Sequence, residues 1–291
     1  MATPNLNEIH DTLIDLAFKA GEIINNALPD TGPDSKKNSA DLVTQYDRAV
    51  ETMISTALKE KYPDYAFHGE ETYTPTTPLT TAPTFIIDPI DGTINFIHNF
   101  PHACVSLGFA INKIPTVGVV YNPSTQTLYS AIKGQGAFKN RTTRLPLSGT
   151  TPAPLTGLSN ALVAIEWGSD RGGANWGVKT RTFERLGADK SQGGAMVRSF
   201  RSLGSAALNI CAVAEGVVDV YWEGGCWEWD VCAGWVILGE AGGVIVDGNP
   251  GGWEVAVDGR RYLAVRGAEK GQREIVEEFW SYIQGRLTYG N

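Results

Sequence analysis

Four short apolar segments between residues 103 and 139 constrain the fold of this chain more than any other feature. They span 103–111, 115–121, 127–132 and 136–139, and turn-forming residues separate them. These connections are too short for a parallel crossover, which takes a dozen or more residues. The pattern therefore predicts an antiparallel meander and excludes a βαβ series over this stretch.

Helical periodicity precedes and follows the meander. Helices are expected at about 6–24, 44–61, 94–99, 174–187, 205–215, 229–241 and 275–283. Further strands are expected at 65–68, 84–87, 161–166, 198–200, 217–222, 244–246 and 262–265. Helices and mainly antiparallel strands in mixed order predict an α+β layered sandwich.

The polar stretches between these elements indicate how the chain is divided. Residues 30–40 are rich in Gly, Pro, Ser and Lys and predict a mobile loop, while 74–83 predicts an exposed one. Residues 148–157 are rich in Thr, Pro and Gly and are expected to link the two halves of the chain. We expect a single domain over 1–291, with an N-terminal α+β half at 1–147 and a C-terminal half at 158–291.

Composition limits the classes of partner. The chain has 291 residues, of which 42% are hydrophobic, and a net charge of −8 without a basic stripe, which disfavours nucleic acid. The run 231–246 is interrupted by Glu240 and two glycines, so no membrane span is expected. The start of the chain lacks the pattern of a signal peptide, and the four cysteines lack zinc spacing. We expect a soluble cytoplasmic protein with buried free thiols.

Four acidic residues stand at the ends of apolar runs, each beside Gly, Pro or Trp. They are Glu70, Asp88, Asp91 and Asp230. Carboxylates on separate elements suit a shared cation, and Mg²⁺ prefers oxygen ligands, among which the carbonyl of Ile90 is a further candidate. Zinc fits less well because no His or Cys accompanies these acids. Taken singly, Asp230 is equally explained as a helix cap and Asp88 as a turn residue before proline.

A phosphate-binding turn follows the two aspartates. Gly92 and Thr93 open the expected short helix, so their N–H groups lie at its positive end. A plain helix start with Thr93 as N-cap is the alternative. No Ser/His/Asp or Cys/His triad is present, which favours water activated by metal as the nucleophile. Thr93 and Asp47 are candidates to position it, although Asp47 is also typical of a first-turn helix acid.

Two further features have structural explanations. Residues 134–138 resemble a nucleotide loop but precede no helix, and so predict a hairpin turn. The aromatic rings near Asp230 could stack on a base or sugar, or fill the core. These rings belong to Trp222, Trp227 and Trp229.

The chain resembles the inositol monophosphatase family, part of the lithium-sensitive, magnesium-dependent phosphatase superfamily, over nearly its full length. The matching motifs are 41–44 with Asp47, 69–71, 88–96, 204–207, 229–230 with 233–234, and 240–243. The segment 223–229, rich in Trp and Gly, is more similar to the fungal branch, some of whose members sit in quinate-utilisation gene sets.

The resemblance implies a layered αβαβα sandwich of the inositol monophosphatase and fructose-1,6-bisphosphatase type, usually a homodimer. It also implies two to three Mg²⁺ ions and competition by lithium. The implied metal ligands are Glu70, Asp88, the Ile90 carbonyl, Asp91 and Asp230. The implied substrate contacts are Asp91, Gly92, Thr93, Ala206, Glu223 and Asp230, with Ala206 and Glu223 facing the inositol ring.

These observations together predict a Mg²⁺-dependent phosphomonoesterase that hydrolyses myo-inositol 1-phosphate through metal-activated water, oriented by Thr93 with Glu70 or Asp47. The alternatives are a 3′(2′),5′-bisphosphate nucleotidase, a histidinol- or sugar-phosphate phosphatase, and a metal-dependent sensor of phosphorylated metabolites without turnover. Whether Lys36 and Lys37 close over the site stays open, because a solvated loop explains them equally well.

Overall fold

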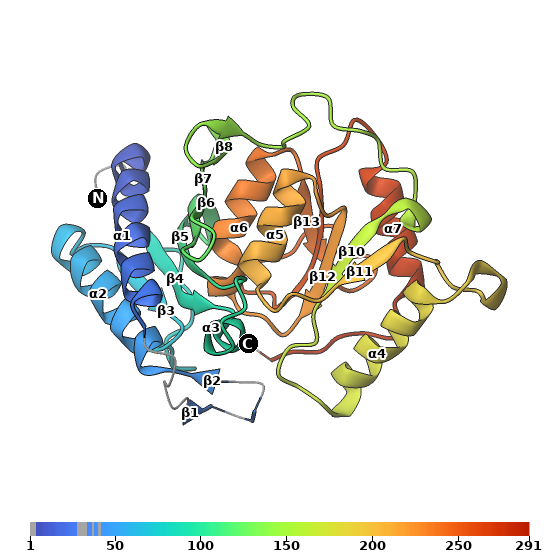
Figure 1. Ribbon diagram of the computed structural model, residues 1–291, viewed down its shortest axis with the longest axis horizontal. Helices are drawn as coiled ribbons and strands as arrows, with labels where there is room; N and C mark the ends of the chain where they lie inside the picture. Colours follow the sequence, from blue (N-terminus) through green and yellow to red (C-terminus); the bar gives the residue numbers. More distant parts are fainter. Residues whose placement is uncertain (1–3, 28–33, 37, 40–41, 291) are drawn as a thin grey trace.

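The computed structural model describes residues 4–27, 34–36, 38–39 and 42–290, and within them the elements stack in five layers (Figure 1). Helices α1 (Leu6–Asn25) and α2 (Gln45–Lys61) form the first layer and cover the outer face of the larger sheet. Helices α5 (Ala206–Glu215) and α6 (Glu228–Glu240) lie between the two sheets. Helices α4 (Gly173–Gly187) and α7 (Gln272–Tyr282) cover the far face of the second sheet. The predicted αβαβα sandwich is confirmed.

The larger sheet contains the predicted meander, with strand order β3-β4-β5-β6-β7-β8-β9. Its strands are β3 (Ala66–Gly69), β4 (Thr84–Asp91), β5 (Cys104–Ile111), β6 (Ile114–Asn122), β7 (Thr127–Ile132), β8 (Gly136–Lys139) and β9 (Thr143–Arg144). Pairing is antiparallel from β5 to β8, as predicted, and β4 and β9 extend this antiparallel order at its two ends. β3 pairs with β4 in parallel, which the long connection over 70–83 allows.

The second sheet is mixed, with strand order β11-β10-β12-β14-β13. Its strands are β10 (Leu162–Ile165), β11 (Ser199–Arg201), β12 (Val220–Gly224), β13 (Val244–Asp247) and β14 (Arg261–Val265). β10 pairs in parallel with both β11 and β12, whereas β14 pairs antiparallel with β12 and β13. Two single turns of 3₁₀ helix lie at Leu158–Asn160 and Lys190–Gln192.

Two segments differ from the sequence prediction. Within 30–40, which was predicted as a mobile loop, β1 (Asp34–Ser35) pairs antiparallel with β2 (Leu42–Val43), while Lys37 and Asp41 lie outside the described residues. The turn predicted to begin at Asp88 starts later, because β4 continues to Asp91 and its pairing with β5 shifts between Asp88 and Asp91. This irregularity accommodates Pro89, which cannot donate a ladder hydrogen bond.

Helix α6 is the centre of the molecule. It contacts β4 to β8 on one side and β13 on the other, so it is apolar on all sides, as expected of a helix buried between two sheets. The four cysteines are buried and free, as predicted. No helix in the described part of the chain is long and apolar enough to cross a membrane.

Candidate active site

A cleft of 320 Å³ opens where the larger sheet, α5, α6 and β12 meet. Among the residues that line it are seven of the predicted site residues: Glu70, Asp91, Gly92, Thr93, Ala206, Glu223 and Asp230. The sequence positions of these residues span more than half of the chain, and the fold brings them to one place. Pockets of this kind, with several convergent polar groups, are typical of small-molecule sites.

Asp88 and Asp91 are placed by the irregular end of β4. Asp88 is buried and its Oδ1 accepts a hydrogen bond from the Ile90 N–H at 2.9 Å, which fixes the carboxylate against its own backbone. Asp91 Oδ2 accepts from the Ser205 hydroxyl at 2.6 Å and from the Ala207 N–H at 2.7 Å. Asp91 therefore sits on the positive end of α5, where Ser205 is the N-cap.

Asp230 enters the cleft from the first turn of α6. Its Oδ2 accepts a hydrogen bond from the Trp227 N–H at 2.6 Å, so it caps the helix as one reading of the sequence proposed. The cap does not exclude the metal role, because carboxylate oxygens accept several hydrogen bonds and ligands at once. Asp88, Asp91 and Asp230 each offer one oxygen, and these atoms all lie within 4.8 Å of one another.

The electrostatics of this acidic cluster fit a bound cation. Burial, together with neighbouring carboxylates, raises the pKa of Asp88 and of Asp230 well above the usual value. Burial raises the pKa of Asp91 to about 6, although its hydrogen bonds to Ser205 and to α5 oppose the shift. Buried like charges at such distances repel one another unless a cation neutralises them. The donor set is all oxygen, which suits Mg²⁺.

Glu70 lies in the same cleft but is held by an ion pair. Its Oε1 lies 2.9 Å from Lys36 Nζ, which also contacts Glu71 Oε1 at 2.7 Å. Burial raises the pKa of Glu70 to about 7, and the positive charge of Lys36 opposes this. The charge of Glu70 in turn raises the pKa of Asp88. The segment predicted to be mobile thus places Lys36 at the rim of the cleft.

Thr93 connects the end of β4 to Asp47. The Thr93 hydroxyl lies 3.2 Å from Asp47 Oδ1 and 3.1 Å from the carbonyl oxygen of Ile90. Asp47 Oδ2 accepts from the Thr44 N–H at 2.8 Å and from the Thr44 hydroxyl at 2.6 Å, forming a capping box at the start of α2. Asp47 is therefore both the first-turn helix acid and the partner of Thr93.

Gly92 is the N-cap of the short helix α3 (Thr93–Ile97) and has a φ of +89°. Thr93 is thus the first helical residue rather than the N-cap. A Cβ on Gly92 would lie 2.9 Å from the carbonyl oxygen of His102, so the position requires glycine. Asp91, Gly92, Thr93 and Ile94 line the cleft together, and the first N–H groups of a helix have no acceptor within the helix, so a phosphate at this turn could accept hydrogen bonds from them.

Glu223 and Ala206 also line the cleft, and Ala206 lies between Ser205 and Ala207, the two residues that donate hydrogen bonds to Asp91. Glu223 lies on β12, is 6% exposed, and accepts a short hydrogen bond from the Tyr221 hydroxyl. Burial raises the pKa of Glu223 to about 7, while the charge of Lys179 opposes the shift. A buried carboxylate at this position can accept a hydrogen bond from a substrate hydroxyl.

Glu166 is a cleft residue that the sequence reasoning missed. Its Oε1 accepts hydrogen bonds from the N–H groups of Leu203 and Gly204 at 2.7 and 2.8 Å and from Asn209 Nδ2 at 2.8 Å. Glu166 thereby fixes the loop that leads into α5 and presents Ala206 to the cleft. No motif marked this glutamate, because it follows an ordinary apolar strand.

The hypothesis that Trp227 stacks on a substrate ring is not supported by the geometry. The Arg260 guanidinium lies 3.4 Å from the Trp227 ring centroid, and Trp229 stacks on Trp227 with the centroids 5.1 Å apart and an interplanar angle of 15°. Two neighbouring groups thus already pack on the ring of Trp227. Trp222 is fully buried in the core.

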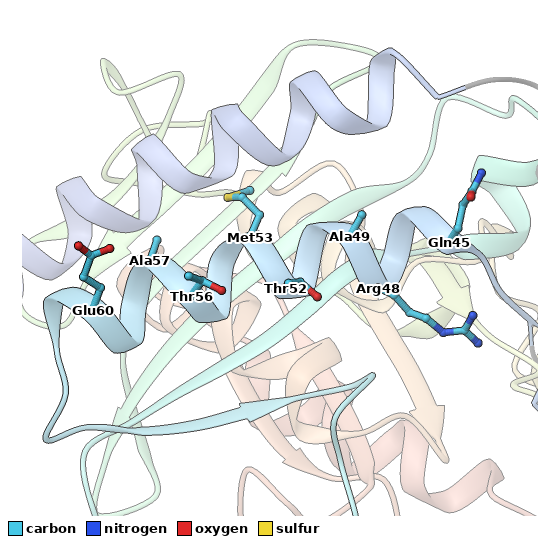
Figure 2. Close-up of a pocket in the computed structure, with 8 residues that line it drawn as sticks. All are labelled: Gln45, Arg48, Ala49, Thr52, Met53, Thr56, Ala57 and Glu60. Carbon is cyan, nitrogen blue, oxygen red and sulfur yellow. The ribbon is translucent and has the colours of Figure 1, made fainter.

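A larger hollow, of 680 Å³, runs along α2 (Figure 2). All the residues that line it belong to this one helix: Gln45, Arg48, Ala49, Thr52, Met53, Thr56, Ala57 and Glu60. Figure 2 shows that Arg48 and Glu60 lie far apart along the helix and do not converge. The smaller cleft, with its converging acids, is therefore the better candidate for the active site.

Comparison with known proteins agrees with this geometry. Residues 5–284 match the inositol monophosphatase family. The Saccharomyces cerevisiae protein Inositol monophosphatase 2 is 45% identical, with 98% of each chain covered. The Emericella nidulans protein qutG is 41% identical, with 98% of this chain and 95% of that protein covered.

The solved structure of an inositol monophosphatase from Anabaena (Nostoc) superposes with a TM-score of 0.77 at 28% identity, over 96% of both chains. Fold, acidic cluster and sequence similarity lead to the same conclusion: this chain belongs to the inositol monophosphatase family and is a metal-binding phosphatase of that family.

Proposed function

We propose that the protein is a Mg²⁺-dependent phosphomonoesterase that releases inorganic phosphate from myo-inositol 1-phosphate or a closely related inositol monophosphate. The observation that carries the proposal is the cleft itself. Asp91, Asp230, the Gly92 turn and the buried carboxylate Glu223 all line it, and Asp88 clusters with Asp91 and Asp230. This arrangement suits an ester whose phosphate would be bound at the acidic cluster and the Gly92 turn, and whose alcohol carries hydroxyl groups from which Glu223 would accept hydrogen bonds.

Glu70, Asp88, the Ile90 carbonyl, Asp91 and Asp230 would hold two to three Mg²⁺ ions. When bound, Mg²⁺ supplies positive charge for the phosphate oxygens and lowers the pKa of water. The N–H groups at Gly92 and Thr93 would hold the phosphate in place. Competition by lithium and a homodimeric state, which the family resemblance implies, belong to the same proposal.

Thr93 and Asp47 would orient the attacking water. The Thr93 hydroxyl has one proton, and both candidate acceptors for it, Asp47 Oδ1 and the Ile90 carbonyl, are fixed in the protein. The lone pairs of the Thr93 oxygen are then left to accept a hydrogen bond from water, which would turn a lone pair of the water oxygen toward the phosphorus. Positioning of this kind supplies a large part of the acceleration in phosphoryl transfer.

Two observations favour an inositol ester over a nucleotide. Trp227 is already packed against Arg260 and Trp229, so its ring is poorly placed to stack on a base. Glu223 provides a buried acceptor for a hydroxyl. Among the family structures, one is described as inositol monophosphate bound SaIMPase-II and another as 2′AMP bound SaIMPase-II, so nucleotide esters belong in the test.

The test compares phosphate release from myo-inositol 1-phosphate and from adenosine 3′,5′-bisphosphate, each with and without Mg²⁺. We expect Mg²⁺-dependent release from the inositol ester and a much slower reaction with the nucleotide. The variants Asp91→Asn and Asp230→Asn should lose at least ~10²-fold in turnover. Preference for the nucleotide would overturn the proposed substrate, and near-normal turnover in both variants would overturn the metal assignment.

A further inference from the structure

Lys179 on α4 is 1% exposed, which is rare for a lysine. Its Nζ donates hydrogen bonds to the carbonyl oxygens of Trp167 at 2.9 Å and of Gly224 at 2.6 Å. These carbonyls belong to two segments that line the cleft, one following β10 and one ending β12. Lys179 therefore holds together two segments of the cleft wall through hydrogen bonds to their backbones.

Lys179 also lies in the neighbourhood of Glu223. A Cβ on Gly168 would lie 3.1 Å from Lys179 Nζ and 4.0 Å from Glu223 Oε1, so both charged groups lie close to this cleft-lining glycine without forming a direct ion pair. Glu223 Oε2 is engaged by the Tyr221 hydroxyl. Oε1 is then the oxygen on the Gly168 side, where a substrate hydroxyl can reach it.

We propose that Lys179 is a positioning residue that keeps Glu223 a charged hydrogen-bond acceptor and so makes the cleft prefer phosphate esters of hydroxyl-rich alcohols. The inference rests on the proposed function, because it concerns the leaving-group end of the same site. A nearby positive charge stabilises a buried carboxylate, and a carboxylate accepts a substrate hydroxyl more strongly than a neutral acid does.

The charges around Glu223 agree with this role. Burial raises the pKa of Glu223 to about 7, and Lys179 is the group that lowers it most, whereas Glu166 and Asp91 raise it. Burial lowers the pKa of Lys179 in turn, and the charge of Glu223 opposes that. The titratable groups that face Glu223 are Lys179 on α4, Tyr221 on β12, Glu166 after β10, Asp91 on β4, and Cys226 and Tyr289. Lys179 is the buried cation beside Glu223; Arg171, which donates to the Gly168 carbonyl, and Arg260, which donates to the Gly225 carbonyl, are the other cations nearby.

The first test is kinetic and uses Lys179→Met, which keeps the length of the side chain and removes its charge. We expect kcat/KM for myo-inositol 1-phosphate to fall about tenfold or more, mainly through KM, while kcat/KM for p-nitrophenyl phosphate, which has no hydroxyl, changes less than about threefold. The acidic limb of the pH profile for the inositol ester should move to higher pH. The exposed residue Lys190 provides the matched control, Lys190→Met, which should change neither ester.

A double variant separates a role through Glu223 from a general structural role. In the Glu223→Gln background, Lys179→Met should have little further effect on the inositol ester, because there is no carboxylate left to hold in its charged form. Equal losses for both esters, or losses that multiply in the double variant, would overturn the inference.

A second measurement needs no substrate. The carboxyl ¹³C resonance of Glu223, assigned by its disappearance in Glu223→Gln, should titrate at a higher pH in Lys179→Met than in the wild type; Lys179→Gln serves the same purpose if Lys179→Met does not fold. An unchanged titration would refute the role of Lys179. Absence of phosphate release from either ester by the wild type would instead refute the proposed function, and the titration would still decide the question for Lys179.

Discussion

The buried pair of His68 and Glu228 should stabilise the protein and keep the metal ligands in place. His68 Nε2 lies 2.7 Å from Glu228 Oε1, and the two side chains are 7% and 5% exposed. His68 lies on β3, two residues before Glu70, and Glu228 lies on α6, two residues before Asp230. The pair therefore links the two chain segments that deliver acids to the cleft from different layers of the sandwich.

Removing one partner should cost more than removing both. His68→Leu leaves a buried carboxylate without its ring partner, at a cost of about 3 kcal/mol. With an unfolding entropy of about 2.1 cal/mol/K per residue, this lowers the Tm of a chain of 291 residues by roughly 5 °C. The double variant His68→Leu/Glu228→Met replaces the pair with apolar groups and should stay within about 2 °C of wild type.

The assay is thermal unfolding of the wild type, both single variants and the double variant, with EDTA and with Mg²⁺. The surface pair of Lys61 and Glu8, 3.1 Å apart and with side chains 44% and 49% exposed, supplies the control, because Glu8→Gln should cost less than about 1 kcal/mol. We also expect the Mg²⁺ concentration for half-maximal activity to rise in the single variants. The reasoning fails if the Tm of the single variants falls no more than that of Glu8→Gln. It also fails if the fall in Tm of the double variant equals the sum of the falls in the two single variants.

Three further predictions concern the cleft. Because burial raises the pKa of Asp91 to about 6, the stability contributed by its protonated form is lost as the pH rises from about 4 through 6. Between pH 5 and 7.5, urea titrations of the metal-free protein should show a loss roughly 1 kcal/mol greater than in Asp91→Asn, in which the raised pKa values of Glu70 and Glu223 still cause a loss. Equal losses in the two proteins would contradict this role of Asp91. Gly92→Ala should raise KM for phosphate esters at least about tenfold without loss of secondary structure, because its Cβ meets the carbonyl of His102; an unchanged KM would contradict the assigned phosphate cradle. Glu166→Gln should lower kcat/KM about tenfold, because one amide oxygen replaces a carboxylate that holds the loop before α5, and wild-type kinetics in this variant would show that the loop needs no such anchor.

Much of the fold could be predicted because local sequence patterns determine most of its helices and strands. The strands at 127–132 and 136–139 agree with the structure residue for residue, since apolar runs bounded by turn residues define them. The parallel pairing of β3 with β4, and of β10 with β11 and β12, could not be predicted, because it depends on contacts between segments distant in sequence. The ribbon formed by β1 and β2 was missed because its polar composition is typical of a loop.

The clustering of Asp88, Asp91 and Asp230 could be predicted, and the residues that support the cleft could not. Asp88 and Asp91 stand in a dense motif, whereas Glu166 and Lys179 stand alone among ordinary helix and strand residues. A lysine in an amphipathic helix normally faces solvent, so nothing local indicated that Lys179 is buried. The role of Lys36 depends on a contact across 34 residues of sequence. Such residues acquire their function from tertiary packing alone.

The position of α6 between the two sheets has a consequence for the stage of folding at which the acidic cluster becomes complete. The N-terminal segment that forms the larger sheet carries Glu70, Asp88 and Asp91, but Asp230 arrives only when α6 docks against that sheet. A nascent or partly folded chain would therefore hold an incomplete set of the proposed ligands, and we expect it to bind a divalent cation weakly. Uptake of the ion would mark the last stage of assembly, so that a chain gains catalytic competence only after its layers have closed around the central helix.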